Sequence, residues 1–348
     1  MSRRTKGLLV VFLLAVVGIG WLIYMEGADD RALAAYSDVH ADEAALAVEV
    51  LGAMPPELTE TSGVAISRRD AGVIWSHNDS GDTPTLYRID RTGRLTGTFE
   101  LGGAEAFDWE AMDIGPCLAP STSDDVDGSS DTEVDASLEG SEDTSPESEP
   151  SRDCLYAADV GDNGLQRESV TVYVVAEPGP ERSDGILQGV RALHLSYPDG
   201  ARDSEAVAIP PEGGLILITK GRTPDIDLHW VSPSLLAESI GSPDVLPLPP
   251  GVRLPIEPDW QVGRAVTGAA VHPDGHILAV RTYSEIRFYQ WPLGDEPVEA
   301  ARPCHLGSTE PQGEAIAFDT DGHLLLTSED RSGIEGMLLR VSCAGVTG

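Results

Sequence analysis

The feature that most constrains this chain is a short strand motif that recurs five times after residue 60. Most copies begin with a small or acidic residue, and all continue as strand-forming residues: SGVAIS from 62, WEAMDI from 109, SEAVAI from 204, TGAAVH from 267 and GEAIAF from 313. No convincing amphipathic helix follows residue 45, except for a short candidate at 234–239. This pattern predicts an all-β domain.

Each copy of the motif is followed by two more apolar or alternating runs. The second runs are VIWSHN (73–78), CLYAAD (154–159), LILITK (215–220), ILAVRT (277–282) and LLLTSE (324–329). The third runs are TLYRID (85–90), VTVYVV (170–175), DLHWV (227–231), IRFYQW (286–291) and MLLRVS (337–342). With residues 118–153 set aside, the copies start about 46 to 63 residues apart, a spacing typical of four-stranded propeller blades. We therefore expect a five-bladed β-propeller.

The last repeat is one strand short. Its third strand ends at 342 and the sequence ends at Gly348, so VEVLG at 48–52 is expected to supply the fourth strand and close the ring. Two alternatives stay open at this point. A sixth blade would have to lie within 233–262, and a β-sandwich would make the repeats coincidental.

The N-terminus predicts a membrane anchor. Basic residues up to Lys6 precede an almost unbroken apolar run, Gly7–Met25, and acidic residues follow it. Nineteen residues span about 28 Å as a helix, close to the hydrocarbon thickness of a bilayer. We expect a signal anchor at 1–25, a spacer at 26–44 and a domain at 45–348.

Charge asymmetry around that run indicates where the domain lies. Positive residues beside a membrane helix stay on the cytoplasmic side. The domain is therefore expected on the periplasmic or extracellular side, tethered to the membrane by one N-terminal helix. A small-residue site at Ala32-Leu33-Ala34 gives the alternative, a signal peptide that is cleaved to release a secreted domain. Both readings export the domain.

The charge of the chain excludes one class of partner. Lys and Arg number 23 against 58 Asp and Glu, for a net charge of −35, so binding to nucleic acid through phosphate contacts is not expected. Twelve of the acidic residues lie between 118 and 153, a segment without aromatic residues that predicts a disordered loop interrupting the domain.

The four cysteines fit an oxidising compartment. Cys117 and Cys154 bracket the acidic segment and are expected to form a disulfide at its base, which leaves Cys304 and Cys343 as the second pair. Zinc is the competing interpretation, but there is no C-x-x-C, and the single H-x-x-x-H spans a Pro-Asp-Gly turn at 272–276.

Candidate site residues follow from the topology of a blade. Successive strands reverse direction, so the start of each inner strand and the end of each second strand meet at one rim. The expected metal ligands there are Glu60, Asp79, Asp108 and Asp203. The expected catalytic residues are Glu110, Glu205, Glu314 and Lys220. The expected ligand-binding residues are Asn78, Asp159, Arg281 and Glu329.

Converging carboxylates either raise one another's pKa or recruit a hard cation such as calcium. The loops NDSGD (78–82) and DVGDN (159–163) hold clustered oxygen ligands at equivalent places, although tight turns alone would explain their composition. Each carboxylate also has a structural alternative, a bond to the backbone of a neighbouring blade. Ser62 as a nucleophile and His77 as a base are weaker candidates, because no nucleophile-elbow motif surrounds Ser62.

Several of these segments together resemble a known family. They are ETSG (60–63), HNDSGD (77–82), DWEA (108–111), ADVGDN (158–163), AEP (176–178), YPDG (197–200), DSEA (203–206), TK (219–220), VRTY (280–283) and GEAIAF (313–318). The set is similar to bacterial exported propellers with a phytase-like domain, the "esterase-like activity of phytase" family, over roughly 60–330. The resemblance implies a propeller with an acidic, calcium-dependent site.

Two functions are consistent with these observations. The first is a calcium-assisted hydrolase of phosphoester, ester or lactone substrates, acting on a small polar ligand at the propeller mouth. The second is a non-catalytic propeller that binds a ligand or a protein and holds a structural ion. Inositol phosphate is disfavoured as a substrate, because the chain lacks a dense set of basic residues. No oligomeric state is predicted.

Overall fold

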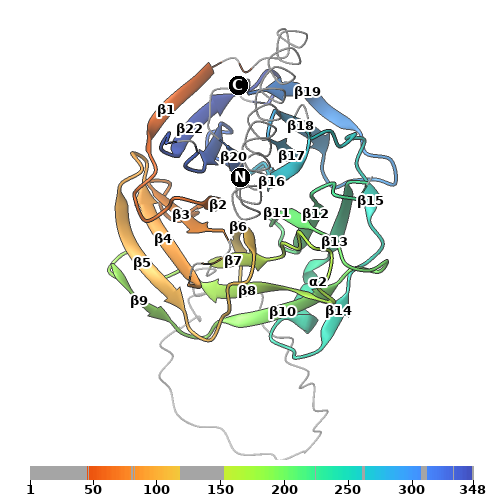
Figure 1. Cartoon of the computed structure of the whole chain (residues 1–348), viewed down its shortest axis with the longest axis horizontal. Coiled ribbons are helices and arrows are strands. Elements are labelled where there is room, and N and C mark those ends of the chain that lie inside the picture. Colours follow the sequence, from red (N-terminus) through yellow and green to blue (C-terminus); the bar gives the residue numbers. More distant parts are fainter. Residues whose placement is uncertain are drawn as a thin grey trace, which may run out of the picture.

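Five sheets form a ring around a central axis (Figure 1). This computed structural model describes residues 45, 47–79, 81, 83–117, 153–223, 225–260, 263–306, 312–331 and 333–346. Within them the predicted all-β architecture with five blades is confirmed. The segments 1–44 and 118–152 lie outside the described residues, and so do the predictions of an anchor, a spacer and a disordered loop.

The strands of each blade follow the predicted repeat. The inner strands are β2 (Thr61–Ile66), β6 (Trp109–Pro116), β11 (Ser204–Ala208), β16 (Val266–Val271) and β20 (Gly313–Phe318). The second strands are β3 (Val73–Asn78), β7 (Asp153–Asp159), β12 (Leu215–Thr219), β17 (Ile277–Thr282) and β21 (Leu324–Ser328). The third strands are β4 (Thr85–Asp90), β8 (Val170–Ala176), β13 (Asp227–Val231), β18 (Glu285–Gln290) and β22 (Met337–Ser342).

The outermost antiparallel strands complete the blades. They are β5 (Leu95–Leu101), β10 (Arg191–Ser196), β15 (Val252–Arg253), β19 (Glu299–His305) and β1 (Ala47–Ala53). β1 pairs antiparallel with β22, from Ala47 opposite Ser342 to Ala53 opposite Met337. The predicted closure of the last blade by the N-terminal strand is confirmed, and Figure 1 shows β1 beside β22.

The predicted alternative of a sixth blade is wrong. Residues 233–262 contain the short helix α2 (Pro233–Ser239) and two short strands. β14 (Val245–Pro247) pairs parallel with β10 in the second blade, and β15 pairs with β13 in the third. The segment is therefore divided between two existing blades. In the same way β9 (Asp184–Leu187) adds a parallel strand to β5 of the first blade.

Apolar side chains fill the spaces between blades. Each of the five buried clusters joins two neighbouring blades, such as Trp75 and Phe99 of the first blade with Trp109 and Leu155 of the second. The inner strands β2, β11 and β20 are buried along their whole length, because both faces pack on neighbours. Small residues permit this approach at the axis: a Cβ at Gly63 would lie 2.3 Å from His77 Nε2.

Both predicted disulfides are present. Cys117 is bonded to Cys154, which joins the end of β6 to β7. Cys304 of β19 is bonded to Cys343, which ties the fourth blade to the chain just after β22. Among the described residues no helix has the length and apolar character needed to cross a membrane.

Candidate functional site

A β-bulge at the start of each inner strand places side chains at one mouth of the ring. The pairing of inner and second strands shifts register at this point in all five blades. A bulge leaves a residue unpaired and turns its side chain away from the regular alternation. The residues within the five shifts include Ser62, Glu110, Glu205, Thr267 and Glu314.

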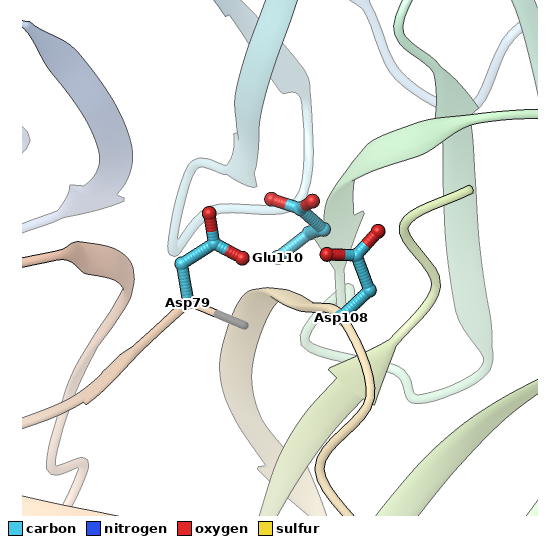
Figure 2. Close-up of side chains that lie close together, drawn as sticks. All are labelled: Asp79, Asp108 and Glu110. Carbon is cyan, nitrogen blue, oxygen red and sulfur yellow. The ribbon is translucent and has the colours of Figure 1, made fainter. Parts of the chain in front are cut away.

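Three carboxylates come together at this mouth, which we call the carboxylate mouth. Asp79 follows β3, Asp108 precedes β6, and Glu110 lies in the bulge of β6. Figure 2 shows the three side chains pointing toward a common space. One oxygen of each can be chosen so that all lie within 4.8 Å of one another. We call these residues the acidic triad.

A glycine makes this convergence possible. A Cβ built on Gly161 would lie 2.4 Å from Asp108 Oδ2 and 2.5 Å from Glu110 Oε1. Real Cβ atoms do not approach other heavy atoms so closely, so any other residue would push the carboxylates away. The loop after β7 thus forms a close wall against the two carboxylates, which a larger residue would displace.

Burial and mutual repulsion perturb the triad. Burial raises the pKa of Asp108 to about 6, and the charges of Asp79 and Asp203 add to the rise. Burial also raises the pKa of Glu110 well above its usual range, with Asp79 contributing further and Lys220 opposing. Gathering these charges without a cation is unfavourable, so the site favours either protons or a positive ion.

A second carboxylate pair lies at the same mouth. Gln312 Nε2 donates to Glu314 Oε1 at 2.7 Å and to Glu329 Oε2 at 2.8 Å, while Arg331 donates to Gln312 Oε1. Burial raises the pKa of Glu314 to about 7, against the opposing bond from Gln312. Burial, followed by the charge of Glu314, raises the pKa of Glu329 to about 8. These groups can exchange protons near neutral pH.

Lys220 supplies a positive charge at the mouth. It forms an ion pair with Glu205, and both side chains are almost entirely buried. Its ammonium lies 5.9 Å from the ring centroid of Trp260 and 6.0 Å from that of Tyr283. Trp260 is half exposed and also stacks with Arg222. An aromatic and cationic edge therefore borders the carboxylates.

The side chains of two predicted site residues are held by hydrogen bonds and ion pairs within the protein. Asp159 accepts hydrogen bonds from the backbone N–H groups of Phe107 and Asp108 and pairs with Arg167 at 2.7 Å. Asp203 accepts from the N–H of Asp162 at 2.8 Å and pairs with Arg222. Asp159 thus positions the chain that carries Asp108, Asp203 positions the loop after β7, and neither carboxylate belongs to the triad.

The first-blade residues Asn78 and Glu60 are also tied together. Asn78 Oδ1 accepts from the N–H of Glu60, and Asn78 Nδ2 donates to the carbonyl of Glu57 at 2.8 Å. The carbonyl of Glu60 in turn accepts from the N–H of Asp79 at 2.8 Å. This loop positions Asp79, while the side chain of Glu60 lies exposed at the rim.

Arg281 lies beneath the mouth rather than on its surface. Its side chain has no exposed area, and Nη1 donates to the carbonyls of Ala315 at 2.6 Å and Thr327 at 3.0 Å. These carbonyls belong to the next blade. The predicted role in binding a ligand remains a prediction, and the contacts indicate a link between blades.

The two weaker candidates lie close to the triad but are enclosed. Ser62 Oγ donates to the carbonyl of Glu110 at 3.0 Å and lies 3.3 Å from Glu110 Oε2. His77 is fully buried, packs edge-on against Trp109, and has its pKa lowered by desolvation. Neither forms a nucleophile and base pair with the other in the hydrogen bonds of the described residues.

Several residues at the mouth escaped prediction from the sequence. Gln312, Trp260, Arg167 and Arg222 all contact the predicted carboxylates or their neighbours, whereas Gly161 lies in the DVGDN loop that the sequence indicated. One signal was available: Gln312 directly precedes a repeat copy that carries a glutamate in its bulge. The others come from irregular loops, where no period points to them.

No family model matches the chain, and no curated protein matches it. Solved structures with similar coordinates include a PQQ-bound aldose sugar dehydrogenase from Streptomyces coelicolor, 15% identical, covering 85% of this chain and 98% of that one, with a TM-score of 0.40.

Two further structures are similar to the same extent. The calcium-binding protein regucalcin from Agrobacterium tumefaciens is 14% identical over 86% of this chain and 96% of its own, with a TM-score of 0.39. A glucose dehydrogenase is 14% identical over 86% and 100%, with a TM-score of 0.44. These structures do not support the phytase-like family in particular, and likenesses of this strength assign no chemistry to the chain.

Proposed function

We propose that this protein is an exported propeller that binds calcium at the carboxylate mouth and hydrolyses small ester, lactone or phosphoester substrates there. The observation that carries the proposal is the convergence of Asp79, Asp108 and Glu110 around one space. The resemblance to phytase-like exported propellers supports the class of bond that is broken.

The triad fits calcium by ligand type and by spacing. Calcium binds carboxylate oxygens at about 2.4 Å, so two oxygens on one ion lie at most about 4.8 Å apart. The selected oxygens of the triad meet that limit. The wall at Gly161 adds an independent argument, because a side chain there would fill the space against Asp108 and Glu110.

The remaining groups at the mouth supply the other requirements of hydrolysis. A calcium ion held by the triad would polarise a carbonyl or phosphoryl oxygen as a Lewis acid. Glu314, with a pKa of about 7, accepts a proton from an attacking water, and Gln312 holds its carboxylate in place. Lys220 neutralises negative charge on the substrate, and Trp260 offers an exposed face for its apolar part.

The second function, a propeller with a purely structural ion, also has an observation in its favour. Asp79 comes from the first blade, whereas Asp108 and Glu110 come from the chain entering the second. An ion bound by all three would cross-link two blades. Lys220 and Glu205 already neutralise each other, which would leave Lys220 less able to pair with a charged substrate.

Calorimetric titration with calcium tests the binding step. The full-length protein is expected to bind calcium, and the double variant D79N/D108N is expected to lose at least a hundredfold in affinity. D244N, which removes an exposed carboxylate, is the matched control and should bind as the parent does. Equal affinity in D79N/D108N and the parent would rule out the triad as the calcium site.

A panel of aryl esters, lactones and phosphoesters tests the hydrolytic step. Turnover is expected with calcium and not with chelator, and E314Q should lower kcat at least tenfold while calcium affinity stays within twofold. If calcium binds at the triad and no member of the panel is turned over, the hydrolytic proposal fails and the structural ion is favoured.

Export is the remaining part of the proposal. The two disulfides support an oxidising compartment, and the basic residues before Gly7 support an orientation with the domain outside. Protease added to intact cells, or to spheroplasts where an outer membrane surrounds the cell, is expected to degrade the domain. Protection in both until the cytoplasmic membrane is lysed would place the domain inside and contradict this part.

A further inference from the structure

The mouth opposite the carboxylates contains a hollow. It has a cavity volume of about 240 Å³, and all five inner strands contribute to it near their ends. Its walls are largely apolar and include Ile66, Ile114, Ile209, Ala270, Ala317 and Phe318. We call this hollow the apolar mouth. Nothing in the chemistry proposed for the carboxylate mouth uses it.

A narrow waist separates the two mouths. The space at mid-channel is about 10 Å³ and is lined by small residues such as Gly63, Ala111 and Gly268. That volume accepts no more than a single water. Thr267 also lines it, and its buried hydroxyl has no hydrogen-bond partner among the described residues, which one water would satisfy. A ligand at one mouth therefore does not reach the other.

The carboxylate of Asp113 lies among the apolar side chains that line the hollow. Asp113 Oδ1 accepts from the N–H of Ile114 at 2.8 Å, and Oδ2 accepts from the N–H of Ile209 at 2.7 Å. Two bonds from two different blades hold the carboxyl group rigidly. Each oxygen keeps a further lone pair, because a carboxylate can accept about four hydrogen bonds.

Among the described residues, no nearby cation pairs with Asp113 alone. Burial raises its pKa to about 7, with its two backbone bonds and the charge of Arg68 opposing the rise. Arg68 lines the same hollow, but its side chain is 40% exposed and its Nη1 lies 3.5 Å from Asp153 Oδ1. The nearest positive charge is therefore shared with another carboxylate. A cation inside the hollow would meet Asp113 in an apolar surrounding.

We propose that the apolar mouth binds a small organic cation, with its ammonium group on Asp113 and its hydrocarbon body against Ile114, Ile209 and Phe318. The size of the hollow sets the size of the ligand, since drug-sized molecules occupy pockets of about 300 to 1,000 Å³. A monoamine with roughly ten non-hydrogen atoms fills it. The net negative charge of the chain attracts such a ligand.

Three matched probes test this proposal on the full-length protein, with binding followed by calorimetry. Phenethylamine is expected to bind, 2-phenylethanol to bind at least tenfold more weakly, and phenylacetate not to bind measurably. D113N should reduce the affinity for the amine at least tenfold and leave that for the alcohol within twofold. Thr320 is exposed at the rim of the hollow, and T320W should weaken both by blocking the entrance.

The carboxylate mouth provides the control for location. D79N/D108N should bind phenethylamine as tightly as the parent, while losing calcium. Loss of amine binding in D79N/D108N with retention in D113N would place the amine at the wrong mouth and overturn the proposal. Stronger binding of phenylacetate than of the amine would overturn it as well, as would failure of all three probes. Thermal unfolding of D113N and T320W confirms that both variants are folded.

Discussion

The two mouths of this propeller are built by opposite ends of the same five inner strands, yet their chemistry differs. At the start of the strands lie the carboxylates of Glu110, Glu205 and Glu314, and at the ends lie mainly Ile, Ala and Phe. The backbone differs in the same way. Register shifts occur near the starts of all five inner strands, and the paired residues beyond them are in regular register.

This difference teaches that an irregular backbone, as much as composition, makes the polar mouth. In a regular strand buried on both faces a glutamate would point into a neighbouring blade. The bulge frees that position from the alternation, so acidic residues can face the axis without opening the packing between blades. Three predictions test this difference between the mouths, in order of decreasing expected effect.

The first prediction compares the arginines that tie blades together at each mouth. Arg281 has no exposed area and donates to two carbonyls of the fifth blade, whereas Arg91 pairs with Asp319 and is 28% exposed. R281M leaves buried acceptors without a donor and should cost about 3 kcal/mol of unfolding free energy. R91M should cost about 1 kcal/mol.

Urea unfolding of both variants measures the difference. R302M, which changes an exposed arginine, is the control and should leave the unfolding midpoint nearly unchanged. Equal losses for R281M and R91M would mean that the two mouths are held together equally firmly, and that burial of the arginine does not distinguish them.

The second prediction concerns the wall of the acidic triad. G161A adds a Cβ that would meet Asp108 and Glu110, so calcium affinity is expected to fall by about tenfold to a hundredfold, or about 1.4 to 2.7 kcal/mol. Binding of phenethylamine at the apolar mouth should not change. G294A, where a Cβ has room, is the matched control. Unaltered calcium affinity in G161A would separate Gly161 from the site.

The third prediction uses pH, measured with chelator present. Glu314, Glu329 and Asp113 have folded-state pKa values of about 7, 8 and 7, above their unfolded values near 4. The folded state therefore binds more protons than the unfolded state between about pH 4 and 8. The contribution of these three groups to the free energy of unfolding is fully present below this window and is lost as pH rises through it.

Variants at each mouth show how much of the pH-dependent loss of stability comes from that mouth. E314Q/E329Q should remove the larger part of the pH-dependent change, and D113N the smaller part, because one group is involved instead of two. Chemical unfolding at pH 5 and pH 8 measures both. A larger effect from D113N would reverse the assignment of the stronger charge cluster to the carboxylate mouth.

The repeat pattern was enough to predict the fold. Five copies of one strand motif predicted five blades, and the missing fourth strand after 342 predicted closure by β1. The alternative of a sixth blade in 233–262 arose because a long linker gave no sign of where its short strands would pair. β14 joins a blade already complete in sequence, through three residue pairs that no local pattern reveals.

The site could be predicted only in part, for a related reason. Position in the repeat identified the carboxylates that would reach the mouth, including Asp108 and Glu110. It did not identify which of them would be held by hydrogen bonds and ion pairs within the protein. Asp159 and Asp203 are neutralised by Arg167 and Arg222, which come from loops outside the repeat. The reach of a loop depends on its folded path, so spacing in the sequence carries no information about it.

The pairing of β1 with β22 also governs the order of events during folding. A ribosome delivers β1 long before β22, so the first strand has no partner until the other end of the domain has been synthesised. During that interval β1 is an exposed edge that can pair with another chain, and contacts so distant in sequence form slowly. The disulfide between Cys304 and Cys343 anchors the end of β22 to the fourth blade, so it can hold β22 in place before β1 pairs with it.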